Sequence, residues 1–165
     1  MRKKLQQRNP LVEEKEKIVK FFYKNSRYMN KTYGMIKPDA VRKNFTGKII
    51  DKILDAGFKV RGMKLMQMSV EQAQQFYAVH KERPFYGELV EYITSGPVVA
   101  LALEKNNAVS DYRTLLGATD PLEAADGTIR KLYGESKAVN AIHGSDSDEN
   151  AEIEINFIFN QNELI

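Results

Sequence analysis

The sequence predicts an α/β sandwich, in which helices pack on one β-sheet, and three observations support this class. Short apolar or alternating runs bounded by Gly and Pro take turns with segments of helical periodicity. These segments follow the order β-α-β-α-α-β-α-loop-β-α, which contains four strands. The chain has 165 residues, of which 42% are hydrophobic and 28% charged, as in an ordinary globular domain with its own core.

The first part of this domain is predicted to form two strands with one helix between them. Residues 32–37 read as a strand that leaves Lys37 at its end, where a cation can face a pocket or simply be solvated. A helix over 46–56 has its isoleucines on one face and is stopped by a glycine. The second strand covers 58–68 and is expected to bulge near Gly62, where the alternation of apolar residues changes phase.

The middle of the chain is predicted to contain helix, helix, strand and helix. A capping box at Ser69 starts a helix that is expected to continue through His80, and a second helix covers 85–95. Residues 98–103 are the most continuous apolar run, which suits a strand with a neighbour on each edge. A helix over 107–116 follows. For His80, inside a helical run, a structural role is favoured.

The last part leads through a long loop to the second histidine. Residues 117–127 read as a loop, and a structureless stretch of that length is usually functional. A short strand then ends at His143, with Ala141 and His143 on the same side. Gly144 is expected to turn the chain sharply so that the imidazole is presented. Residues 145–148 carry oxygen side chains typical of a helix start.

Residues 151–159 alternate like a strand, but a helix explains one residue better. On a helix the apolar residues form a wide arc, and Glu154 falls inside it. A carboxylate on a buried face needs a partner, and the nearest is the imidazole of His143 or a hydroxyl beside it. If the Glu154 carboxylate binds one nitrogen of the His143 ring, the other nitrogen is free to act as a nucleophile. Two alternatives remain open. In the first, Glu154 is only one partner of a salt bridge; in the second, His143 is a structural residue held by hydrogen bonds.

Composition narrows the class of protein. There is no cysteine, which excludes disulfides, thiolate zinc sites and cysteine nucleophiles. No apolar run approaches the roughly 20 residues that cross a bilayer, so we expect no membrane association and a cytoplasmic location. Neither a Gly-x-x-x-x-Gly-Lys loop nor a Gly-x-Gly-x-x-Gly turn occurs. If the domain handles a nucleotide, side chains rather than a glycine-rich loop must hold the phosphates.

The net charge of +3 is unevenly divided along the chain. Residues 1–28 hold nine Lys and Arg against three Glu, a net charge of +6, whereas residues 29–165 have a net charge of −3. We therefore expect a basic N-terminal extension over 1–28, either disordered or an artefact of the assigned start with Met29 as the first residue, and a domain over 29–165. A basic arm can bind nucleic acid or an anionic membrane; a dispensable appendage is the alternative.

From about Lys31 to the C-terminus the sequence resembles the nucleoside diphosphate kinase family. Six segments carry the resemblance, all in family order, and the last is highly specific. They are Ile36-Lys37-Pro38-Asp39, Arg83-Pro84-Phe85-Tyr86, Ser95-Gly96-Pro97-Val98, Leu116-Gly117-Ala118-Thr119-Asp120-Pro121, Gly127-Thr128-Ile129-Arg130 and Asn140-Ala141-Ile142-His143-Gly144-Ser145-Asp146-Ser147. The resemblance implies a ferredoxin-like four-stranded antiparallel sheet with helices packed on it.

The resemblance also implies a ping-pong reaction. The γ-phosphate of a nucleoside triphosphate, mainly ATP, would be transferred to His143 and then to a nucleoside diphosphate. The implied catalytic residues are His143, Glu154, Ser145 and Tyr77. The implied nucleotide-binding residues are Lys37, Arg113, Thr119 and Arg130 at the phosphates, Lys37 and Asn140 at the sugar, and Phe85 stacked on the base.

The family likeness further implies a cofactor and partners. Mg²⁺ would bridge the phosphates and be carried mainly by the nucleotide, so we expect no protein metal ligand. A homo-oligomer, a hexamer or a tetramer, is expected, with residues 117–127 at subunit contacts. Three positions depart from the family pattern: Asp120 stands where asparagine is common, Lys131 where glycine is common, and Lys137 where an aliphatic residue covers the base opposite Phe85. These positions bear on nucleotide affinity and loop geometry rather than on the chemistry.

Three functions remain to be separated. The first is the phosphotransferase. The second is a binding module without turnover, a nucleotide sensor or, through the basic extension, a nucleic-acid-associated protein. The third is a histidine phosphocarrier that passes phosphate to proteins. Every family position needed for chemistry is present, which favours the first and makes nucleic acid an unexpected partner.

Overall fold

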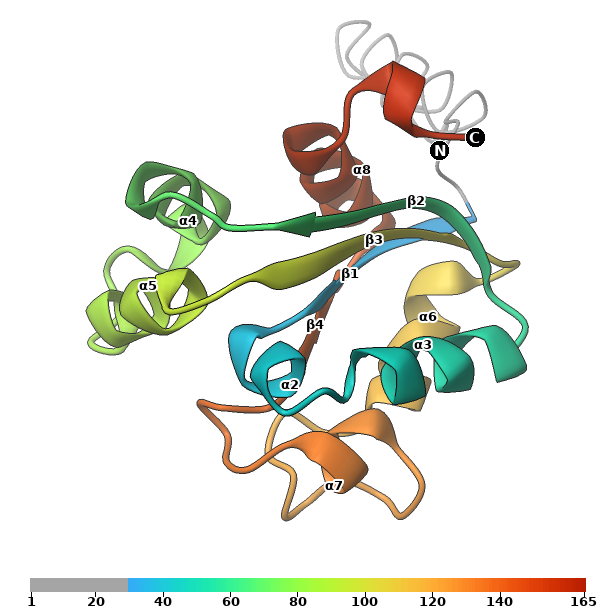
Figure 1. Ribbon diagram of the computed structural model, residues 1–165, viewed down its shortest axis with the longest axis horizontal. Helices are drawn as coiled ribbons and strands as arrows, with labels where there is room; N and C mark the ends of the chain where they lie inside the picture. The colour runs from blue at the N-terminus through green and yellow to red at the C-terminus, as the bar shows by residue number, and fades with distance from the viewer. Residues whose placement is uncertain (1–29) are drawn as a thin grey trace, which may run out of the picture.

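The computed structural model describes residues 30–165, which form a four-stranded sheet with helices on both faces (Figure 1). The strands are β1 (Lys31–Ile36), β2 (Lys59–Met66), β3 (Val98–Glu104) and β4 (Ile142–Gly144). Their order is β2-β3-β1-β4, and every neighbouring pair is antiparallel. The ferredoxin-like antiparallel sheet is therefore confirmed. The predicted extension over 1–28 lies outside the described residues.

Two hydrophobic cores lie on opposite faces of this sheet, because successive residues of a strand point to opposite sides. One core contains Tyr33 and Met35 of β1 and is covered by α4 (Val70–Phe76), α5 (Tyr86–Thr94) and α8 (Asp148–Ile158). The other contains Ile36 and is covered by α3 (Thr46–Asp55), α6 (Ala108–Leu116) and α7 (Ile129–Tyr133). The remaining helices are α2 (Pro38–Arg42), η1 (Ala78–His80) and η2 (Gln161–Glu163).

The strands confirm two details of the prediction. β3 has β1 on one edge and β2 on the other, as its continuous apolar run indicates. The β2–β3 register shifts between Val60 and Gly62, so the bulge is where the alternation changes phase. Packing also requires a glycine at position 62, because a Cβ there would lie 2.9 Å from the Leu164 side chain.

One predicted helix is too long and two short helices were missed. The helix from Ser69 ends at Phe76 rather than His80, and η1 follows after Tyr77, whose φ of −99° and ψ of 19° leave the α-helical geometry. The short helices α2 and α7 were not predicted. Each has only five residues, too few to show a helical period in the sequence. Pro38 is the first residue of α2, two positions after β1 ends.

The reason predicted for Gly144 was also wrong. Gly144 lies inside β4, directly opposite Gly34 of β1, and has no positive φ. What requires glycine is space: a Cβ at Gly144 would lie 2.8 Å from the Tyr112 ring, and one at Gly34 would lie within 3 Å of the same ring. The two glycines let α6 lie close to the sheet, on the face opposite to the one that bears His143.

The alternation predicted for the strand before His143 fails at Ala141. Its φ is +69°, a value uncommon for residues other than glycine, so regular strand geometry begins only at Ile142. Among residues 30–165 no helix is both long and apolar enough to cross a membrane.

Candidate active site

His143 lies at the centre of the short strand β4, with Met35 of β1 as its register partner. Its side chain therefore points to the face that α8 covers. After β4 the chain reaches Ser147, which caps α8 by accepting a hydrogen bond from the amide of Asn150. The His143 side chain retains 21% of its exposure, so the ring is half-buried but open to a ligand.

A chain of hydrogen bonds connects β1 to this imidazole. The Tyr33 amide donates to Ser145 Oγ at 3.2 Å, and the Ser145 hydroxyl donates to Glu154 Oε2. The other oxygen of Glu154 lies 2.9 Å from His143 Nε2. Because a carboxylate accepts, Nε2 carries the hydrogen, and in the neutral ring Nδ1 bears the lone pair. Nδ1 has no hydrogen-bond partner among the residues that the structure describes.

Three aromatic rings surround the imidazole. The ring centroids of Tyr33, Phe76 and Tyr77 lie 5.9, 5.4 and 6.1 Å from that of His143, and Tyr77 meets it edge-on at 88°. The hydroxyls of Tyr33 and Tyr77 are buried without a protein partner in the described part of the chain. Burial, and then nearby charge including that of Glu154, raises the pKa of both phenols, so both stay neutral. The walls beside the imidazole are therefore aromatic and uncharged.

Two cations lie on one side of the site, one buried and the other partly buried. Lys37, only 7% exposed, donates from Nζ to Asn140 Oδ1 at 2.7 Å. Burial, helped by the charge of Arg130 and opposed by Asp39, lowers the pKa of Lys37 from 10.5 to about 8. Arg130 on α7 donates to the carbonyls of Gly117 and Ile142, and burial and then Arg113 lower its pKa. Two close cations with few counter-charges are arranged to receive an anion.

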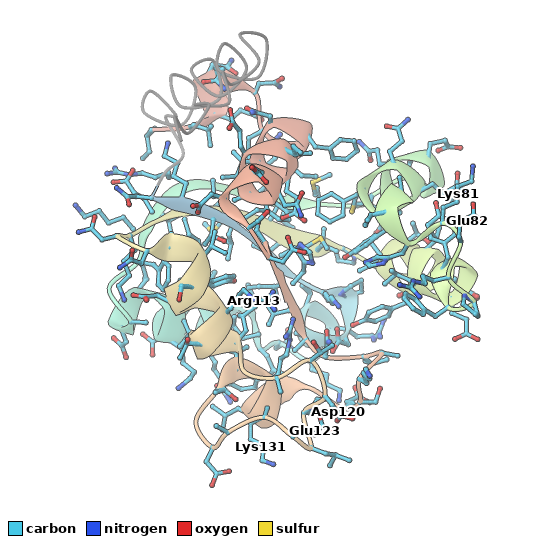
Figure 2. All side chains as sticks on the ribbon, turned by 180° about the vertical axis from the view of Figure 1, so that it is seen from behind. Lys81, Glu82, Arg113, Asp120, Glu123 and Lys131 are labelled. Carbon is cyan, nitrogen blue, oxygen red and sulfur yellow. The ribbon has the colours of Figure 1, made fainter. Side chains whose placement is uncertain are left out.

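The remaining predicted nucleotide residues are exposed. Phe85, 49% exposed, precedes α5, and its ring centroid lies 5.6 Å from that of His80. Thr119 is exposed, but its carbonyl accepts from Asn140 Nδ2 at 3.1 Å. Arg113 is exposed on α6 and is labelled near the middle of Figure 2.

Each of the three departures from the family pattern makes a local hydrogen bond. Asp120 Oδ1 accepts from the Leu122 amide at 2.9 Å, and Figure 2 shows Asp120 in the loop next to α7. Lys131 on α7 reaches the Leu122 carbonyl at 3.4 Å. Lys137 is exposed, and its carbonyl accepts from Asn140 Nδ2. Asp120 and Lys131 therefore both tie down the loop before α7.

Sequence reasoning missed four residues of this region: Tyr33, Phe76, Asp39 and Tyr92. Tyr33 and His143 are far apart in the chain, and only the β1–β4 pairing brings them together. Phe76 adjoins the predicted Tyr77, so the Phe-Tyr pair at the end of α4 was an available signal. Asp39 belongs to the first segment that carries the resemblance, but nothing local in the sequence indicates its contact with Tyr92, because their hydrogen bond joins the start of α2 to the last turn of α5.

A histidine held by a carboxylate beside two cations, on an antiparallel sheet, is the arrangement of a site that can act on an anionic substrate. Comparison with known proteins gives the family. The family model described as "Nucleoside diphosphate kinase" matches residues 30–164. A nucleoside diphosphate kinase of Chloroherpeton thalassium is 60% identical over 137 residues, 83% of this chain and 97% of the relative. The chain therefore belongs to the nucleoside diphosphate kinase family and is an enzyme.

Solved structures support the same assignment. The Aquifex aeolicus nucleoside diphosphate kinase is 45% identical with a TM-score of 0.81, over 82% of this chain and 99% of that one. A Halobacterium salinarum nucleoside diphosphate kinase, solved in complex with CDP, is 42% identical with a TM-score of 0.79, over 82% and 90%. Both likenesses cover the sheet and the helices on its two faces.

Enzymes of this family use a divalent cation. Within residues 30–165, His, Asp and Glu form no group of three or more that could hold a metal ion. The side chains described above instead favour anions, since Lys37 is a buried cation and Arg130 is a partly buried one. A divalent cation fits this site as the companion of bound phosphates.

Proposed function

We propose that this enzyme transfers the γ-phosphate of a nucleoside triphosphate, mainly ATP, to a nucleoside diphosphate through a phosphohistidine on His143. The observation that supports this most strongly is the asymmetry of the imidazole. Nε2 is tied to Glu154 at 2.9 Å, and Nδ1 has no partner in the described part of the chain. A ring held in one tautomer presents a lone pair in a fixed direction.

In the first half-reaction, the Nδ1 lone pair attacks the γ-phosphorus while the bond from that phosphorus to the bridging oxygen breaks. The nucleoside diphosphate leaves with the electron pair, and Nε2 keeps its proton. Glu154 balances the positive charge that the ring gains. In the second half-reaction, a terminal oxygen of another diphosphate attacks the phosphorus, and the N–P bond electrons return to Nδ1.

The protein side chains would hold the substrate for both halves. Lys37, Arg113, Thr119 and Arg130 neutralise or hydrogen-bond the phosphate oxygens, where charge develops during transfer. Lys37 and Asn140 reach the sugar, and Phe85 stacks on the base. Stacking accepts any base, which predicts broad use of nucleotides. Mg²⁺ would accompany the nucleotide, with no protein residue proposed as its ligand, and would supply further neutralisation of the phosphate charge.

Ser145 and Tyr77 have supporting parts in this proposal. Ser145 accepts from the Tyr33 amide and donates to Glu154, so it fixes the carboxylate that fixes the ring. Tyr77 meets the imidazole edge-on and limits its rotation. Lys131, Asp120 and Lys137 would change nucleotide affinity without entering the chemistry.

A labelling experiment tests this function. The purified protein is mixed with γ-labelled ATP and Mg²⁺, and we expect an acid-labile, base-stable phosphoprotein whose label moves to GTP when GDP is added. The matched control is His143→Ala, which should take up no label and should stay folded. Label that will not move to GDP would favour a phosphocarrier. No label on the wild type would favour a nucleotide-binding module.

We further propose a domain over 29–165 with a basic extension over 1–28, and a cytoplasmic homo-oligomer, a hexamer or tetramer. β2 is an outer strand of the sheet, and Met63 and Leu65 on it are 57% and 71% exposed, as suits a contact between copies. Residues 117–127 are the second candidate contact. Light scattering on the purified full chain measures the number of subunits, and a monomer at micromolar concentration would contradict this proposal.

A further inference from the structure

Directly before β4 the backbone makes an unusual turn. The Ile142 amide donates to the Asn140 carbonyl at 2.8 Å, so the hydrogen bond spans only Ala141. This is a γ-turn, and with a central φ of +69° it is the rare, strained form. For alanine, which has a Cβ, this conformation costs free energy unless the surroundings hold it.

Two hydrogen bonds hold the central residue of this turn. The Ala141 amide donates to Asp39 Oδ2 at 3.2 Å, and the Ala141 carbonyl accepts from the Lys37 amide at 2.9 Å. Both partners belong to the junction between β1 and α2. Ala141 is fully buried and Asp39 is 1% exposed, so water cannot replace either bond.

Asp39 is itself fixed from the other side. Its Oδ1 accepts a hydrogen bond from the Tyr92 hydroxyl of α5, and the Lys37 ammonium lies 5.7 Å from the Tyr92 ring centroid. The carboxylate is therefore held between α5 and the turn.

The residues that flank the turn lead directly to the reactive groups. Asn140 on one side binds the Lys37 ammonium, and Ile142 on the other is followed at once by His143. A change in the Ala141 conformation would therefore move both the side-chain amide of Asn140, which binds Lys37, and the imidazole of His143. The turn therefore fixes the spacing between the proposed phosphate-binding cation and the proposed nucleophile.

We propose that Asp39 is a positioning residue for the phosphoryl transfer, because it holds the strained turn at Ala141 and thereby keeps His143 and Asn140 aligned with Lys37. This inference rests on the proposed function for its kinetic consequence. Its structural part, the retention of the turn, does not depend on turnover.

The test is a double-mutant cycle between Asp39→Ala and Ala141→Gly. Asp39→Ala should lower the rate of His143 phosphorylation at saturating ATP by about 10- to 100-fold, the scale of a small misplacement of reacting groups. Glycine adopts a φ of +69° without a Cβ penalty. In the Ala141→Gly background the same substitution should therefore cost less than about threefold. Asp39→Asn, which keeps an oxygen for the Ala141 amide, should retain most of the rate.

A purely structural role for Asp39 predicts a different pattern. Asp39→Ala would then cause the same loss in the wild-type and Ala141→Gly backgrounds, and that result, or no loss at all, would overturn the inference. Ile53→Ala is the matched control, because it truncates a side chain of α3 in the same hydrophobic core as Ala141 but removes no hydrogen bond to the turn: it should lower the melting temperature but leave the rate unchanged. If Asp39→Ala does not fold, Tyr92→Phe removes one support of the carboxylate, and its smaller loss should likewise shrink with Ala141→Gly.

Hydrogen exchange separates this inference from the proposed function. The Ala141 amide should be protected in the wild type and should exchange at least about tenfold faster in Asp39→Ala or Tyr92→Phe. Unchanged protection would overturn the inference even if His143 is phosphorylated as proposed. Absence of label on the wild type would instead contradict the proposed function, while the exchange result still decides whether Asp39 holds the turn.

Discussion

The candidate site has a buried half and an exposed half, and the two are built differently. In the buried half, His143, Glu154 and Lys37 each have a hydrogen-bond partner whose position is fixed by the sheet or by a helix on it. In the exposed half, Phe85 precedes α5 and Arg113 lies on α6, and both are exposed to solvent. The fold thus fixes the imidazole, its carboxylate and the cation proposed to hold phosphate, and leaves Phe85 and Arg113 adjustable. Substitutions in the two halves should accordingly affect different kinetic constants.

Glu154→Gln should give the largest effect and would sharpen the contrast most. Glutamine keeps the shape but loses the charge that fixes the ring tautomer and balances the imidazolium. We expect phosphorylation of His143 to slow by about 10- to 100-fold, or about 1.4–2.7 kcal/mol, with little change in nucleotide affinity. Rapid-quench labelling together with calorimetric binding of ADP measures both quantities. Unchanged kinetics would show that Glu154 is structural only.

The pH dependence of kcat/KM should give the next effect. Since burial lowers the Lys37 pKa to about 8, kcat/KM should fall about tenfold per pH unit above that value as the ammonium is lost. The contribution of Lys37 to the free energy of unfolding changes with pH in the opposite direction to kcat/KM. Between pH 8 and 10.5 the unfolded state binds this proton and the folded state does not, so this contribution rises with pH.

Pairing the two measurements makes this prediction specific. A pH–rate profile and denaturant unfolding at the same pH values should diverge, with activity falling while the Lys37 contribution to stability rises. In Lys37→Met the alkaline limb of the profile should be missing, although the remaining activity will be low. An alkaline limb of the same position in Lys37→Met would assign the titration to another group.

Phe85→Ala should have a smaller effect, confined to binding. Stacking of a base on an aromatic ring is worth about 1–3 kcal/mol, and the exposure of Phe85 favours the lower part of that range. We expect KM for every nucleotide to rise about three- to tenfold with kcat nearly constant. Phe85→Tyr, which keeps the ring, is the matched control. A fall in kcat instead would break the division between the two halves.

Removal of residues 1–28 should have the smallest effect. The matched family segment begins at residue 30, and none of the groups proposed for catalysis lies before it. We expect kcat and KM to change less than about twofold, within the usual scatter of surface changes. Steady-state assays of the full and shortened chains compare them directly, and a large loss would make this segment part of the enzyme.

The fold could be predicted from the sequence wherever local pattern decides the structure. The apolar runs identified all four strands, and the position of Glu154 on an apolar arc distinguished a helix from a strand over 151–159. The resemblance supplied the strand directions. Local pattern failed where residues far apart in the sequence determine which side chain fits. At Gly144, for example, the Tyr112 ring on α6 leaves no room for a Cβ.

The candidate site shows the same division. The partnership of Glu154 with His143 could be inferred because the two residues are close in the chain and the helix period places the carboxylate. Tyr33 and Asp39 could not, because they approach through strand pairing and through a turn more than 100 residues away. The positive φ of Ala141 could not be predicted either, because alanine normally has a negative φ.

The facing glycines of β1 and β4 have a consequence for anyone who would redesign this enzyme. Gly34 and Gly144 lie on the reverse side of the strands that carry the imidazole, and the Tyr112 ring rests against both. Packing on the face that contacts α6 therefore affects the position of His143 on the opposite face. The size of the Tyr112 ring determines how close β4 lies to α6. An engineer could shift the nucleophile by fractions of an ångström from this side, without altering any group that a nucleotide would touch.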